Sequence, residues 1–136
     1  MQLTQISNPD PSQSLAYRVA RLVYAETGAS SLHVAEALTS MIANRARGTG
    51  VEIESLIVNS ELFTALNPDS VFHSRLSVKP SNRGFQMCLR VARRMLMGTL
   101  PDCCFGATKF HHTDSIPDWA TALGYIDDVD GILFYL

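Results

Sequence analysis

One carboxylate in this chain stands where the hydrophobic pattern predicts a buried position. The segment 15–27, LAYRVARLVYAET, places Val19 and Leu22 on one stripe of a helix. Glu26 falls in the middle of the same stripe, just before Gly28, a residue typical of helix ends. Burial disfavours the charged form of a carboxyl group, so the spacing makes Glu26 a candidate proton donor. The alternative is an exposed carboxylate on the last helical turn.

Two other sets of residues have types that could do chemistry. His111, His112 and Asp114 are metal-ligand types, but adjacent strand residues point to opposite faces, so the two imidazoles would not easily share one ion. Cys103 or Cys104 could act as a nucleophile with His111, but neither has an obvious cationic partner to lower its thiol pKa. We therefore expect no metal ion and no cofactor. A binding or structural module without chemistry is the remaining alternative.

Trp119 is the single tryptophan of the chain, within the segment 116–120, IPDWA. A lone tryptophan is commonly a core residue. Its aromatic face also suits the apolar face of a sugar ring at the edge of a cleft. The sequence alone leaves both interpretations open.

Length and composition fit one folded domain. The chain has 136 residues, of which 46% are hydrophobic and 18% charged. Its net charge of −2 gives no overall attraction to nucleic acid, and no apolar run reaches the ~20 residues of a membrane-spanning helix. The N-terminus lacks the basic and apolar regions of a secretory signal, so we expect synthesis in the cytoplasm without a signal peptide. We also expect free cysteines and a monomer.

The hydrophobic pattern predicts an α+β fold with a helical lobe and a small C-terminal antiparallel sheet. Residues 1–14 form a polar N-terminal arm in this interpretation, and 15–136 a single catalytic domain. Helices are expected over 15–27, 32–47, 53–58 and 82–97. Short strands are expected over 108–112, 123–126 and 132–135, with a turn at 127–131 whose Asp-Gly pair is typical of a hairpin.

Several short stretches follow one another in the order and spacing of a known family. They are LVYAE (22–26), IANR (42–45), LFT (62–64), GTLPD (98–102), GATKFH (106–111), PDWA (117–120) and FY (134–135). Together they resemble the cell wall hydrolase family of the spore-cortex-lytic enzymes, the SleB/CwlJ type. The resemblance extends from about residue 15 to residue 136.

This resemblance implies a lysozyme-like fold and cleavage of the glycan strand of peptidoglycan at N-acetylmuramic acid, in the manner of a lytic transglycosylase. The catalytic glutamate of the family corresponds to Glu26. Residues that would bind substrate or support the cleft are Phe63, Thr64, Phe110, His111, Trp119 and Tyr135. With one catalytic carboxylate, the expected product carries a 1,6-anhydro end, whereas ordinary hydrolysis uses two carboxylates. Asp127 and Asp128 are expected to be turn residues.

The chain also departs from the family. Glu61 stands where the family tends to have Gln, and Asp130 and Ile132 stand where it often has Gly and His. A catalytically inactive glycan-binding or virion structural module of the same fold is therefore the alternative function. The family's secretion signal and wall-binding repeats do not appear, so we expect delivery to the cell wall by other machinery, such as a phage lysis system.

Overall fold

The structure is a computed structural model that describes residues 14–136. Its elements are α2 (Leu15–Thr27), α3 (Leu32–Thr49), α4 (Ile53–Leu56), η2 (Thr64–Leu66), η3 (His73–Ser77), α5 (Arg83–Leu96), β1 (Lys109–His112), β2 (Tyr125–Val129) and β3 (Ile132–Tyr135). The predicted α+β class, with helices preceding a small antiparallel sheet, is confirmed. The predicted N-terminal arm, apart from Ser14, lies outside the described residues.

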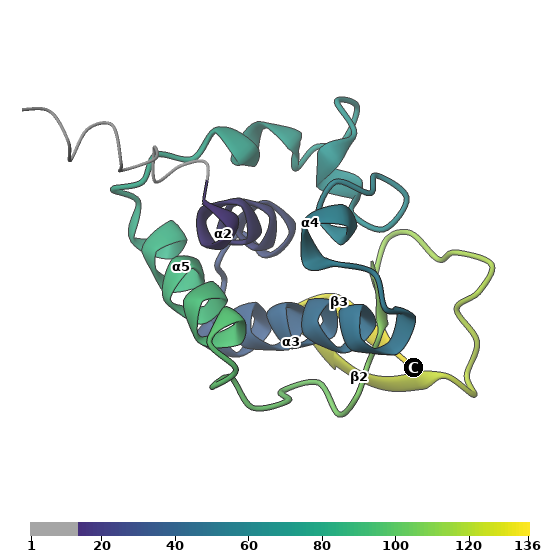
Figure 1. The fold of residues 1–136 in the computed structure, drawn as a ribbon. Coiled ribbons are helices and arrows are strands. Elements are labelled where there is room, and N and C mark those ends of the chain that lie inside the picture. The colour runs from purple at the N-terminus through teal and green to yellow at the C-terminus, as the bar shows by residue number, and fades with distance from the viewer. Residues whose placement is uncertain (1–13) are drawn as a thin grey trace, which may run out of the picture.

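Helix α2 lies at the centre of the helical lobe. It packs against α3, α5, η2 and η3, and Figure 1 shows α5 and α3 on two of its sides. The Ser14 hydroxyl accepts a hydrogen bond from the backbone N–H of Tyr17 and so caps the first turn. Gly28 ends the helix at φ 64°, a left-handed conformation that favours glycine. The predicted bounds of this helix are confirmed.

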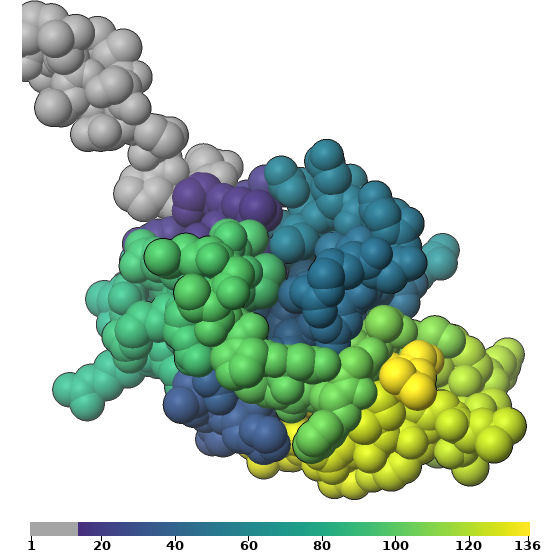
Figure 2. Space-filling view, turned by 60° about the horizontal axis from the view of Figure 1, so that its bottom comes forward, coloured from purple at the N-terminus to yellow at the C-terminus, as the bar shows by residue number. Residues whose placement is uncertain are grey.

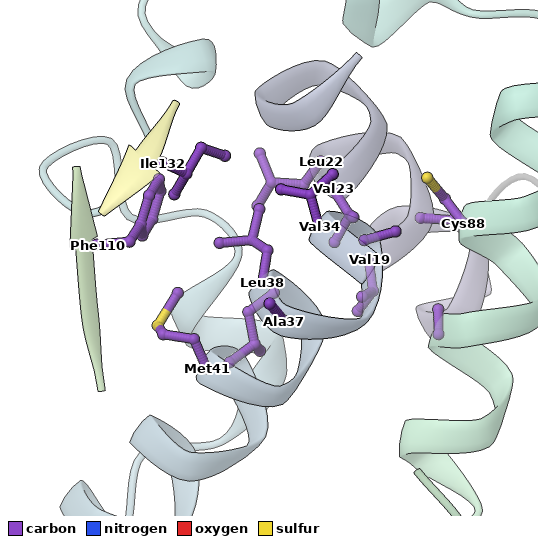
Figure 3. Close-up of a cluster of buried hydrophobic side chains, with 14 of the residues drawn as sticks. Val19, Leu22, Val23, Val34, Ala37, Leu38, Met41, Cys88, Phe110 and Ile132 are labelled. Atoms are coloured by element: carbon purple, nitrogen blue, oxygen red, sulfur yellow. The ribbon is translucent and has the colours of Figure 1, made fainter. Parts of the chain in front are cut away.

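The hydrophobic core lies where α2, α3, α5 and the sheet meet. Figure 3 shows the side chains of Leu22 and Val23 from α2 pointing toward Val34 and Leu38 of α3. All four are almost fully buried. Phe110 reaches the same cluster from β1. The core therefore fixes β1 relative to α2, although the two are far apart in the sequence.

The sheet has the order β1-β3-β2, with both neighbouring pairs antiparallel. Figure 2 shows the C-terminal segment from residue 110 onward, in lime and yellow, gathered on one side of the molecule. Asp130 (φ 50°) and Gly131 (φ 82°) form the two-residue turn between β2 and β3. The Asp130 carboxylate accepts hydrogen bonds from the hydroxyls of Ser30 (2.9 Å) and Ser31 (2.7 Å). These bonds attach the hairpin to the α2–α3 turn.

Several predicted bounds of the elements are wrong. Helix α3 continues through Gly48 to Thr49, and Gly50 forms its left-handed C-cap with φ 72°. Asp127 and Asp128 lie in strand β2, because the turn needs only the two residues with positive φ. Helix α4 ends at Leu56 instead of residue 58, and the strand expected over 123–126 lies at Tyr125–Val129.

The connection from α5 to β1 is organised by Asp102. Its carboxylate accepts hydrogen bonds from the backbone N–H groups of Cys104 (3.1 Å) and Gly106 (2.7 Å) and from the Asn44 side chain (3.3 Å). Burial alone would raise the pKa of this carboxyl group, but these hydrogen bonds outweigh that effect and lower it. The charged form of Asp102 therefore stabilises the segment that leads into β1. No helix within residues 14–136 is long and apolar enough to cross a membrane.

Replacing Asp102 by asparagine should lower the melting temperature at neutral pH, because the amide cannot accept all three hydrogen bonds. The folded pKa lies below the unfolded one, so the stabilisation is present above the unfolded value and is lost as the pH falls through the folded value. We expect the difference in melting temperature between wild type and Asp102→Asn to be largest near neutral pH and to shrink below about pH 4. Thermal unfolding followed by circular dichroism measures it. A difference that is constant with pH would contradict this account.

Candidate active site

Glu26 occupies the last turn of α2 with its side chain fully buried, at 0% exposure. The prediction that this position belongs to the buried stripe is confirmed. Its Oε2 accepts a hydrogen bond from the backbone N–H of Ala65 at 2.8 Å. Its Oε1 lies 2.7 Å from Nε2 of His112 and 3.4 Å from the hydroxyl of Thr64, which donates to it. The carboxyl group is therefore held from two sides by polar partners.

The partners of Glu26 come from two distant segments. Ala65 lies 39 residues away, in η2, and His112 lies 86 residues away, at the end of β1. Phe63, fully buried directly before η2, anchors that segment against Phe110 of β1, with 5.5 Å between ring centroids. The core thus brings η2 and β1 to the end of α2.

His112 lies between Glu26 and the surface. Its side chain is 14% exposed, and its ring packs against Phe72 at 4.8 Å and edge-on against Phe110 at 6.0 Å between centroids. Within the described residues, Nε2 bonds to Glu26 and no hydrogen bond to Nδ1 is found. The sequence pattern indicated His112 only as a candidate metal ligand, and its pairing with Glu26 was not predicted. Strand alternation was the available signal, because His112 lies two residues after the core residue Phe110.

His111 points to the other face of β1. Its Nδ1 lies 2.7 Å from the backbone oxygen of His112, and its Nε2 lies 3.0 Å from the hydroxyl of Tyr135. The two histidines therefore have separate partners on opposite faces, as the strand pattern predicted. The described part of the chain contains no group of three or more His, Cys, Asp or Glu side chains that could hold a metal ion.

A cleft of about 540 Å³ lies above this pair. It is lined by residues of the segment 61–72, by residues 110–112 and by residues of the segment 114–119, and we call it the His112 cleft. His112 and Thr64 line it, whereas Glu26 lies beneath them. Any group in the cleft meets the imidazole of His112 before it meets the carboxyl group of Glu26.

The structure brings most of the predicted binding residues to this cleft. Thr64, Phe110, His111 and Trp119 line it. Phe63 is buried behind Phe110, and Tyr135 supports His111 through its hydroxyl group and a stacked ring at 5.3 Å.

The structure does not place Trp119 in the core. It is 40% exposed at the rim of the cleft, with its ring edge-on to those of His111 and Tyr135. The ammonium group of Lys109 lies over the same ring, 5.6 Å from its centroid.

Three exposed carboxylates also line the cleft: Glu61, Asp69 and Asp114. Asp127 and Asp128 do not. The carboxylates that line the cleft are therefore open to solvent, in contrast to the buried Glu26 beneath it.

The thiol groups lie outside this site. Burial raises the pKa of Cys88 and of Cys104 to about 12, and it also raises that of Cys103. Among the described residues, none of the three thiols forms a hydrogen bond with a histidine. The geometry gives no support to a cysteine nucleophile.

The chain was compared with protein-family models, curated proteins and solved structures. No protein-family model, no curated protein and no solved structure matches the chain.

The three cysteines should differ in reactivity. Cys103 is partly exposed, whereas Cys88 and Cys104 are buried with pKa values of about 12. We expect a thiol reagent such as DTNB to modify only Cys103 in the native protein at pH 8, and all three after unfolding. Cys103→Ser should then show no reaction before unfolding. Rapid modification of two or more thiols in the native protein would contradict the described burial.

Proposed function

We propose that the chain cleaves the glycan strand of peptidoglycan at N-acetylmuramic acid, as a lytic transglycosylase, with Glu26 and His112 as its acid–base pair. The observation that carries the proposal is the fully buried Glu26 carboxyl group, hydrogen-bonded to His112 at the floor of a cleft. A buried titratable pair beneath a cleft is typical of a catalytic site. The sequence motifs that resemble the cell wall hydrolases supply the substrate class.

The cleft suits a sugar chain. Trp119 is 40% exposed at the rim with the Lys109 ammonium group over its ring, and a pyranose ring can stack on the opposite face. The side chains of Asn67, Ser70 and Asp114 line the same space and can hydrogen-bond to hydroxyl groups. A volume of about 540 Å³ accommodates a few sugar units, with the remainder of the strand in solvent.

The position of His112 determines the proton path in this proposal. Because the Glu26 side chain has no exposed surface, the proton reaches the substrate through the imidazole. Protonated His112, stabilised by the Glu26 carboxylate, gives a proton to the glycosidic oxygen as the C1–O bond breaks and an oxocarbenium-like centre forms. Neutral His112 then accepts the proton of the 6-hydroxyl group as that oxygen bonds to C1, which yields the 1,6-anhydro end. Glu26 orients the imidazole and stabilises its protonated form, as the aspartate does in a Ser-His-Asp triad.

Glycan binding without turnover is the second candidate function. The observation that favours it is the complete enclosure of Glu26, whose oxygens already have partners in Ala65 and His112. A buried carboxylate with satisfied hydrogen bonds can be a purely structural group. Turnover measurements separate the two candidates.

Replacing Glu26 by glutamine should abolish cleavage, because the amide cannot support a charged imidazole. We expect wild type to release muropeptides with anhydromuramic ends from purified peptidoglycan, and Glu26→Gln to release at least ~10²-fold less. Mass spectrometry of the released fragments measures both. Glu52→Gln, an exposed glutamate outside the cleft, is the matched control and should retain full activity.

Two other results of that experiment would redirect the proposal. Reducing ends would indicate hydrolysis and assign the second carboxylate to Glu61, Asp69 or Asp114, the other acids of the cleft. No release by wild type would contradict an enzyme and support the binding module.

Replacing His112 by alanine tests the proton path separately. We expect a loss of at least ~10²-fold in kcat, because the buried carboxyl group then has no relay to the glycosidic oxygen. His33→Ala, at an exposed position of α3, is the control. Thermal unfolding of each variant shows whether the fold is kept. Activity of folded His112→Ala within a few-fold of wild type would mean that Glu26 meets the glycosidic oxygen directly.

A further inference from the structure

A second hollow continues the His112 cleft. It has a volume of about 280 Å³. The two share four lining residues: Glu61, Leu62, Phe110 and Trp119. Arg45 and Lys109 line only the second hollow, which we call the basic compartment. A strand lying in the His112 cleft can therefore extend a side group past Trp119 toward two cations.

Lys109 is positioned rather than mobile in solvent. Its ammonium group lies over the ring of Trp119, with Nζ 5.6 Å from the ring centroid. Within residues 14–136 it forms no ion pair with a carboxylate. The charge of Lys109 is thus held at the junction of the cleft and the compartment and is left available for an anion.

Arg45 supplies the second cation. One terminal nitrogen of its guanidinium group donates to the backbone oxygen of Thr108 at 3.1 Å, which fixes the side chain against the start of β1. Its Nε is the one buried side-chain polar atom in the described part of the chain that lacks a hydrogen-bond partner. Because this atom is closed to solvent, the guanidinium charge, and not this N–H, is what the compartment offers to a ligand.

The excess positive charge of the basic compartment favours an anionic ligand. Arg45 and Lys109 face one carboxylate, that of Glu61, so a cation remains unneutralised. Asn59 adds an amide whose oxygen is already used by the backbone N–H of Glu61 at 2.9 Å. Two cations and an amide nitrogen form a donor set that suits a carboxylate.

We propose that the basic compartment is a subsite for a carboxylate of the peptide stem that branches from the glycan strand in the His112 cleft. This inference rests on the proposed function, because the stem is the anionic branch of a peptidoglycan strand whose sugar rings are neutral. The compartment gives the protein a preference for glycan strands that carry stems, and Lys109 is the residue that determines this specificity.

The test compares intact peptidoglycan with the same material after its stem carboxylates have been converted to neutral amides, because amidase digestion would leave a lactyl carboxylate on every muramic acid. Wild type is expected to cleave intact strands about tenfold more efficiently than amidated strands, and Lys109→Gln to lose that preference. Lys79→Gln makes the same charge change at the other lysine and should keep the wild-type preference. An equal loss by Lys109→Gln on both substrates, or no loss on either, would overturn the subsite.

A binding measurement separates this inference from the proposed function. Isothermal titration of soluble glycan fragments into Glu26→Gln, with and without Lys109→Gln, needs no turnover. The subsite is supported if Lys109→Gln weakens the binding of stem-bearing fragments about tenfold and leaves the binding of stem-free fragments unchanged. This result counts even if no protein cleaves peptidoglycan. If the protein cleaves peptidoglycan but its binding affinity and its cleavage rate do not depend on the stem, the proposed function stands and the subsite is rejected.

Discussion

The arrangement of this molecule depends on the burial of one carboxyl group. Removing Glu26 from water is unfavourable unless its oxygens are hydrogen-bonded, and the structure supplies Ala65 at 2.8 Å and His112 at 2.7 Å. Each partner belongs to a different segment, so the carboxyl group is satisfied only when η2 and β1 have both docked on α2. Removing one partner leaves a buried polar group without its hydrogen bond, which typically costs about 1–3 kcal/mol. Site assembly and folding are therefore coupled through Glu26.

Strand β1 links this pair to the rest of the proposed binding surface. One face directs Phe110 to the core and His112 to Glu26, while the other directs His111 to Tyr135 and Trp119. At its start, Lys109 lies at the junction of the two hollows. Four consecutive residues thus provide a cation, a core anchor, a support for the aromatic rim and the imidazole partner of Glu26. The period of two in a strand makes this division of roles possible.

The sequence pattern predicted those features that local periodicity controls. The helical stripe of α2 identified Glu26, and the alternation of a strand separated His111 from His112. The turn was only partly predicted, because Asp127 and Asp128 can belong to a turn or to a strand until pairing with β3 selects β2. The Glu26–His112 pair and the contact of Asp130 with Ser30 could not be read from spacing, since they join residues 86 and 100 positions apart. Such contacts depend on how the elements pack.

The most direct test of the account is a crystal structure of Glu26→Gln with a stem-bearing peptidoglycan fragment bound. The account predicts a sugar ring against Trp119, a glycosidic oxygen about 3 Å from Nδ1 of His112, and a stem carboxylate beside Lys109. A fragment bound outside the His112 cleft, or bound there with its glycosidic bond out of reach of His112, would contradict the account.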